Sequence, residues 1–145
     1  MSKKSAEDLP KNAIEAQGQL IKAFYEKYGN EILPIIETVL GRQGRALGLR
    51  TKKKISDNKL STVAKVFSKS NDPESVKVIS ISDEKFHIQG MQCPFGLENT
   101  SRELCEAVMA IDYEYFNIAT DRKINLHINK TVAAGDPFCD TIYTV

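Results

Sequence analysis

Residues 93–139 have the sequence CPFGLENTSRELCEAVMAIDYEYFNIATDRKINLHINKTVAAGDPFC, and the predicted fold is organised around this segment. It holds all three cysteines of the chain, Cys93, Cys105 and Cys139. Apolar residues at spacings of three and four predict a helix over residues 100–119. A thiol in a folded protein packs as a small apolar group, binds a metal or attacks an electrophile, and the pattern leaves all three uses open.

The rest of the chain divides into a helical first part and a second part dominated by strands. Apolar stripes of helical period predict three helices before residue 70, and alternating runs rich in β-branched residues predict strands after it. The predicted helices cover residues 6–28, 31–47, 57–68 and 100–119, and the predicted strands cover residues 75–81, 85–92, 123–132 and 138–145.

This order of elements predicts one domain over residues 1–145, with a helical part at 6–70 and an α/β part at 75–145. Because helices and strands are segregated along the chain, the expected class is α+β. The strands should form a mostly antiparallel four-stranded sheet, with a helix inserted between the second and third strands and helices packed on one face. The first two strands should pair as a hairpin.

Local signals mark the ends of the helices. Gly29 suits the left-handed residue that ends the first helix, and Asn30 is expected to cap the second helix, with Pro34 in its first turn. Thr100 and Glu103 have the spacing of a capping box, with Thr100 as the cap.

The second predicted helix contains three glycines, Gly41, Gly44 and Gly48. Each costs about 1 kcal/mol relative to alanine. Two explanations stay open: close backbone approach by another element or a ligand, or a frayed helix end. The basic stretch from Arg42 to Lys54 contains no acid. A solvated charged linker is favoured there over a site for an anion or for nucleic acid, because no aromatic residues are interleaved to stack on bases.

Composition and charge argue against several classes of protein. The chain has 145 residues, of which 41% are hydrophobic, and a net charge of +1, so no global field favours nucleic acid or an anionic membrane. No apolar run approaches the roughly 18 residues of a spanning helix. The start of the chain lacks the apolar part of a signal peptide, and the cysteine count is odd. We therefore expect a cytoplasmic protein with reduced thiols.

Cys105 and Asp112 are candidate functional residues on one predicted helix. They are seven residues apart, so they share a face at a separation of about 10 Å along the axis. An aspartate on the buried side of a helix needs a partner. Three roles stay open for Asp112: a general acid or base, an anchor for a polar substrate, or a structural carboxylate bonded to backbone N–H groups near Gly135.

Cys93 and Cys139 lie at strand ends that can converge on the helix carrying Cys105. Three converging thiols would be able to bind zinc or an iron–sulfur cluster, although no C-x-x-C pair supports such a site. The fourth ligand would be His87, His127 or Asp112. Both histidines fall on the polar faces of their predicted strands, and a sheet face exposed to solvent is the simple explanation for this. If that face is covered, they become candidate proton-transfer groups.

Several of these residues form a pattern that resembles a known family. The pattern consists of Cys93-Pro94, Glu103-Leu104-Cys105, Asp112 and Gly135-Asp136-Pro137-Phe138-Cys139. It resembles the L-2-amino-thiazoline-4-carboxylic acid hydrolase-like family, which is similar in layout to 4-vinyl-reductase-like small-molecule-binding domains. One position departs from the family pattern, because Met109 stands where a further cysteine often follows Cys105 by one helical turn.

The resemblance implies hydrolytic opening of a thiazoline-like ring in a pocket lined by the helix that carries Cys105 and Asp112. A thiolate or an activated water would attack the ring carbon, and Asp112 would manage protons or the substrate nitrogen. The residues expected to be catalytic are Cys105, Asp112 and Cys93, and those expected to bind substrate are Cys139, Asp136 and His127.

Two rival hypotheses stay open beside hydrolysis of a small cyclic C–N or C–S compound. The first is a non-enzymatic domain that binds or senses a small molecule or a metal, with Cys93, Cys105 and Cys139 as the alternative metal ligands. The second is an interaction module whose N-terminal helices form a homodimer. The expected partner is a small molecule, without nucleic acid or membrane.

Overall fold

The computed structural model describes residues 8–145, and its elements follow the predicted order of helices first and strands later. The helices are α1 (Ala13–Tyr28), α2 (Leu33–Lys52), α3 (Leu60–Lys69), α4 (Arg102–Val108) and α5 (Ala110–Thr120), with short 3-10 helices η1 (Gly29–Ile32) and η2 (Val132–Ala134). The strands are β1 (Val76–Ile81), β2 (Lys85–Gly90), β3 (Asn125–Lys130) and β4 (Cys139–Thr144).

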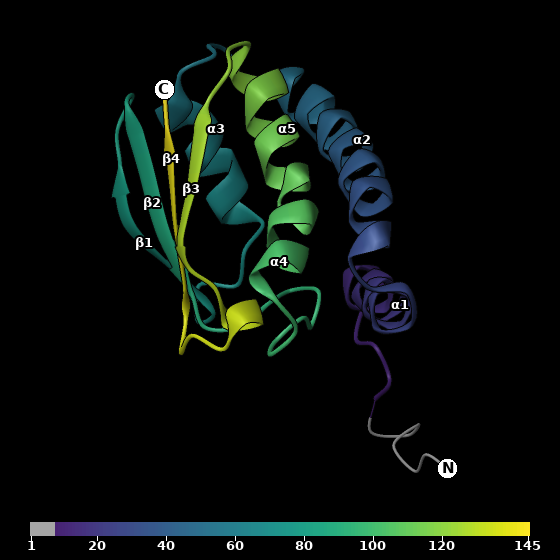
Figure 1. The fold of residues 1–145 in the computed structure, drawn as a ribbon. Helices are drawn as coiled ribbons and strands as arrows, with labels where there is room; N and C mark the ends of the chain where they lie inside the picture. Colours follow the sequence, from purple (N-terminus) through teal and green to yellow (C-terminus); the bar gives the residue numbers. More distant parts are fainter. Residues whose placement is uncertain (1–7) are drawn as a thin grey trace.

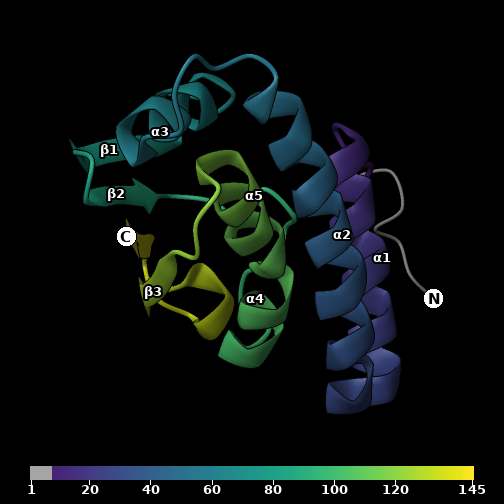
Figure 2. The ribbon, with the colours of Figure 1, turned by 90° about the horizontal axis from the view of Figure 1, so that it is seen from above.

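The four strands form one antiparallel sheet in the order β1-β2-β4-β3, which confirms the predicted α+β class (Figure 1). β1 and β2 pair as the predicted hairpin, whereas β4 lies between β2 and β3. The helices cover one face of the sheet. Seen from above, α3 and the α4–α5 segment are nearest to the strands, and α2 lies on the far side of α5 (Figure 2).

α2 packs on α5 through its glycines, which confirms the close-approach explanation. A Cβ atom on Gly44 would lie 2.1 Å from the Ile111 carbonyl oxygen, and one on Gly48 would lie 2.8 Å from the Tyr115 carbonyl oxygen. A third glycine has the same function in α1, where a Cβ on Gly18 would lie 1.7 Å from the Phe95 carbonyl oxygen. The backbones are therefore in direct contact both where α2 packs on α5 and where α1 packs on the loop that contains Phe95.

α2 continues to Lys52, five residues beyond the predicted end at 47. Much of the basic stretch is therefore helical, and its assignment to a linker was wrong. The tertiary contact with α5 explains the extension, because Gly48 and Thr51 are both buried and Thr51 Oγ1 lies 2.8 Å from Tyr115 Oη. Packing of this kind outweighs the low intrinsic helix propensity of glycine.

The predicted cap of α2 is wrong, and the predicted start of α1 is partly untested. Asn30 does not cap α2, because its side chain accepts a hydrogen bond from Tyr25 Oη. Gly29 ends α1 with a positive φ of 67°, as predicted. The side chain of Asn12 caps α1 by accepting from Glu15 N, so the helix begins later than predicted. Residues 6 and 7 of the predicted helix lie outside the described residues.

The helix predicted at 100–119 is in fact two helices, α4 and α5, which meet at Met109. Ser101, not Thr100, is its N-cap, and Ser101 Oγ accepts from Leu104 N at 3.1 Å. Thr100 is used elsewhere, since its hydroxyl donates to the Leu97 carbonyl.

Two clusters of buried side chains stabilise the fold. One joins α1, α2 and α4 to the loop that follows β2. The other lies between α3, α5 and the sheet and is rich in aromatic rings, with centroids 4.6 Å apart for Phe116 and Tyr143. Within residues 8–145, no helix combines the length and hydropathy needed to cross a bilayer.

Candidate functional site

A cavity of about 670 Å³ lies between the inner face of the sheet and the helices. Residues from all four strands form one side of it, and the five helices, the turn that contains η2 and the loop after β2 supply the rest. Alternation along β4 decides which residues face inward: Cys139, Thr141 and Tyr143 border the cavity. Most of the cavity wall is apolar.

Asp112 and Tyr143 form the polar centre of this cavity. Tyr143 Oη donates to Asp112 Oδ2 at 2.6 Å, and the second carboxylate oxygen, Oδ1, has no hydrogen-bond partner within residues 8–145. The predicted structural bonds to backbone near Gly135 are therefore not made. Burial raises the pKa of Asp112 to about 6, although the Tyr143 hydrogen bond opposes this shift. Burial also raises the pKa of Tyr143 well above its usual value.

All three cysteines border the same cavity, so the strand ends that carry Cys93 and Cys139 do approach the helix that carries Cys105. Thr131 Oγ1 donates to Cys105 Sγ at 3.1 Å, and the backbone N–H of Val132 donates to Cys139 Sγ at 3.5 Å. Burial raises the pKa of Cys105 to about 11 and also raises the pKa of Cys93. The thiols of Cys93 and Cys105 therefore stay protonated near neutral pH and are weak nucleophiles.

The cysteines are free thiols, and their arrangement does not match a metal site. Within the described part of the chain, no group of three or more histidine, cysteine, aspartate or glutamate side chains is arranged to hold a metal ion. Two of the residues considered as a fourth metal ligand lie apart from the thiols. His87 bonds to Asp140, and His127 borders a different hollow.

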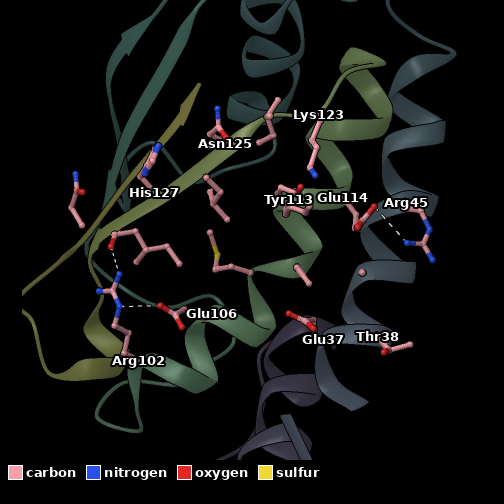
Figure 3. A pocket seen from close by; sticks show the side chains of 17 residues that line it. Glu37, Thr38, Arg45, Arg102, Glu106, Tyr113, Glu114, Lys123, Asn125 and His127 are labelled. Atoms are coloured by element: carbon pink, nitrogen blue, oxygen red, sulfur yellow. Dashed lines mark hydrogen bonds and ion pairs between the residues drawn. The ribbon is translucent and has the colours of Figure 1, made fainter. Parts of the chain in front are cut away.

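That second hollow is a groove of about 850 Å³ between β3, α2 and the α4–α5 segment (Figure 3). Polar and charged side chains line much of it, and several are already paired. Arg45 lies 3.5 Å from Glu114, and Arg102 lies 3.0 Å from Glu106 and also donates to the Ile128 carbonyl. The predicted substrate-binding residue His127 lies here, separate from Asp112 and the cysteines.

Asp136, also predicted to bind substrate, does not border the cavity. Its carboxylate accepts from the backbone N–H of Thr131 at 2.9 Å and so fixes the turn that contains η2. Thr131 in turn bonds to Cys105, which links this turn to the cavity wall. The structure thus gives Asp136 a supporting position beside the site.

The outer face of the sheet carries a polar cluster centred on Asp140. Its carboxylate accepts from His87 Nε2 at 2.6 Å, Gln89 Nε2 at 3.1 Å and Asn129 Nδ2 at 3.0 Å. The His87 and Asp140 side chains are only 18% and 13% exposed, so the simple picture of a fully solvated histidine face is incomplete. Burial raises the pKa of Asp140, but the three hydrogen bonds outweigh it and lower the pKa to about 2.

Sequence reasoning identified Asp112 but missed its partner Tyr143 and the outer-face residue Asp140. A signal for Tyr143 was present, because a tyrosine on the inward face of a strand needs a partner for its hydroxyl, and a buried aspartate needs a donor. Asp140 gave no comparable signal, since acids are common on outward strand positions.

No protein-family model matches the sequence, and no curated protein matches it. Among solved structures, one similar chain is the phenol-responsive sensory domain of the transcription activator PoxR with phenol, at a TM-score of 0.45 and 13% identity, covering 94% of this chain and 76% of that one. A likeness this distant transfers no ligand, and the resemblance to the hydrolase-like family stays a prediction.

Proposed function

We propose that the chain binds a small organic molecule in the central cavity. The observation that carries this proposal is the combination of a mostly apolar cavity of about 670 Å³ with one carboxylate whose Oδ1 has no partner among the described residues. Ligand sites in proteins commonly have volumes of about 300–1,000 Å³, with apolar walls and a few polar groups that fix orientation.

The ligand would pack its apolar part against the cavity wall and donate a hydrogen bond to Asp112. Tyr143 holds one carboxylate oxygen in place, so the other is fixed before the ligand arrives. A fixed acceptor loses little entropy on binding, and a ligand that lacks a donor would leave the acceptor unpaired.

A cavity-filling variant tests this proposal. Val66 on α3 borders the cavity, whereas Val78 on β1 is 40% exposed and does not. Val66→Phe should weaken the binding of N-phenyl-1-naphthylamine, a neutral apolar fluorophore, by about tenfold or more, and Val78→Phe should not. Equal binding by wild type and both variants would remove the cavity as the binding site. Thermal unfolding of each variant checks that the fold is retained.

A second candidate function is hydrolysis of a cyclic C–N or C–S compound such as 2-aminothiazoline-4-carboxylate. The observation in its favour is the raised pKa of Asp112, about 6, which suits a general base that activates water near neutral pH. The raised pKa values of Cys93 and Cys105 argue against a thiolate nucleophile. Under this proposal Asp112→Asn abolishes turnover, and Cys105→Ser retains most of it. Turnover that survives Asp112→Asn would exclude this role for the carboxylate.

A homodimer, a cytoplasmic location and the absence of nucleic-acid partners stay predictions from the sequence. The outer surfaces of α1 and α2 offer one relevant feature, since Leu20, Phe24 and Ile35 are 59%, 43% and 62% exposed. Sedimentation equilibrium at micromolar concentration measures whether two copies associate, and a monomer there would count against the dimer.

A further inference from the structure

Three cations border the cavity without an acidic partner. Arg50 lies near the end of α2, Lys54 follows that helix, and Lys69 ends α3. All three are exposed, and none forms an ion pair with an acid among residues 8–145. Other basic residues of α2 behave differently, because Arg45 pairs with Glu114 and Lys52 with Asp121.

Cations outnumber acids in the wall of the cavity, and the two kinds of charge lie in different parts of the wall. One further cation, Lys130, borders the cavity, but its ammonium group lies over the Phe138 ring, 4.7 Å from the centroid. The only carboxylate in the wall formed by the described residues is Asp112, which is placed deep in the protein beside Tyr143. Unpaired positive charges at a low-dielectric opening attract anions and raise their local concentration.

The chemistry of the wall also changes between the rim and the interior. Ser70 and Asn71 join Lys69 where α3 ends, so this part of the rim is polar, whereas Leu47, Phe67 and Ile88 are apolar. A ligand that matches both zones has a charged head and an apolar body. The basic side chains of this rim are therefore better explained as a binding feature than as a solvated linker.

We propose that the ligand of this cavity is a single-chain organic anion, whose carboxylate or phosphate head is bound by Arg50, Lys54 and Lys69 and whose largely apolar body fills the cavity and carries one hydrogen-bond donor that reaches Asp112. This inference rests on the proposed function, because it assigns a ligand class to the same cavity. Arginine offers a planar fork for either head group, and lysine adds mobile point charges.

The experiment is calorimetric titration of the full chain with octanoate, octyl phosphate and the neutral 1-octanol. We expect both anions to bind about tenfold more tightly than 1-octanol at low salt, with a smaller difference at high salt. The tighter of the two anions identifies the head group. Arg50→Gln/Lys54→Gln/Lys69→Gln should remove the advantage of the anions and leave 1-octanol binding unchanged.

A matched control removes the same number of charges elsewhere on the same helices. Arg42, Lys53 and Lys65 are exposed and do not border the cavity, so Arg42→Gln/Lys53→Gln/Lys65→Gln should keep the advantage of the anions. Equal affinity for octanoate and 1-octanol in wild type would overturn the anion inference while supporting the cavity proposal. The anion inference would also be overturned if the Arg50/Lys54/Lys69 variant still bound the anions more tightly than 1-octanol, or if the control variant lost this difference to the same extent. Binding of none of the three compounds would overturn the anion inference, and the Val66→Phe experiment then judges the cavity separately.

Discussion

Two aspartates on opposite sides of the sheet show how the same side chain acquires different roles. Asp112 reaches the inner face and has one hydrogen-bond donor, Tyr143, and its pKa is raised to about 6. Asp140 lies on the outer face with three side-chain donors, and its pKa is lowered to about 2. Asp112 lies much deeper in the protein than Asp140, so the difference in burial and the difference in the number of donors together set the opposite directions of the two pKa shifts.

The comparison separates a carboxylate that its neighbours satisfy from one that keeps an oxygen open to the cavity. Asp140 has its charge satisfied by neighbouring strands and gains little from a further partner. Asp112 keeps one oxygen unpaired within the described residues and faces a cavity. Among the described residues, Asp112 Oδ1 is not one of the buried polar atoms that lack a partner, so it is open to the cavity, where a hydrogen-bond donor is able to reach it.

The largest expected effect comes from a change that displaces only the inner site. Gly44→Ala would force a Cβ against the Ile111 carbonyl, next to Asp112 on α5, so the helix must shift. We expect a loss of about 3 kcal/mol in the free energy of unfolding. Urea denaturation measures the loss. Asp140 should be unaffected, so the C2 proton shift of His87 in NMR spectra should match the wild type. A variant as stable as wild type would show that α2 and α5 do not meet at this glycine.

Asp112→Asn should change how stability depends on pH. The folded pKa is raised, so the unfolded state releases its proton first, and wild-type stability falls as the pH rises from about 4 to about 6. Asparagine does not titrate. The variant should therefore exceed wild type by about 3 kcal/mol at pH 8 and match it near pH 3.5. Parallel stability curves for the two proteins over this range would contradict a raised pKa.

Tyr143→Phe removes the single donor from Asp112. We expect a loss of about 1.5 kcal/mol at pH 8, because a charged acceptor is left without its hydrogen bond. The pKa of Asp112 should rise further, as followed by the carboxyl carbon shift in NMR spectra. The matched change on the outer face is Gln89→Leu, which leaves Asp140 with two donors. If Gln89→Leu costs as much as Tyr143→Phe, donor number does not distinguish the two aspartates.

Asp140→Asn should have the smallest effect, about 1 kcal/mol at neutral pH. The folded pKa of Asp140 is lowered, so its contribution is present above the unfolded value near 3.8 and disappears as the pH falls through about 2. The difference between variant and wild type in thermal unfolding should therefore shrink in acid. A difference that grows below pH 3 would contradict this direction of shift.

The order of elements was predictable because it depends on local periodicity. The strands differ from their predicted bounds by at most two residues at each end, since alternation and turn residues are properties of short segments. The length of α2 was not predictable in the same way. Its three glycines disfavour a helix, although its arginines and lysines favour one. The buried contact with α5 that retains the helix involves residues distant in sequence.

The candidate site was predicted in part. Asp112 was a candidate site residue because a carboxylate on an apolar helix face is unusual. The three cysteines were candidates because they cluster in one segment. His127 and Asp136 do not border the cavity that Asp112 and the cysteines share, and this separation was not predictable, because strand alternation gives the face of a residue but not what covers that face. Tyr143 became visible as a partner only when the register of β4 against β2 and β3 was known.

The strand order has a consequence for how the chain is synthesised. β4 follows β3 in the sequence but lies between β2 and β3 in the sheet. While residues 139–144 are still inside the ribosome, β3 has no strand to pair with, β2 is paired on one side only, and the cavity lacks Cys139 and Tyr143. The sheet and the site are thus completed in the same step, when β4 has left the ribosome, and until then the exposed strand edges need protection from other chains.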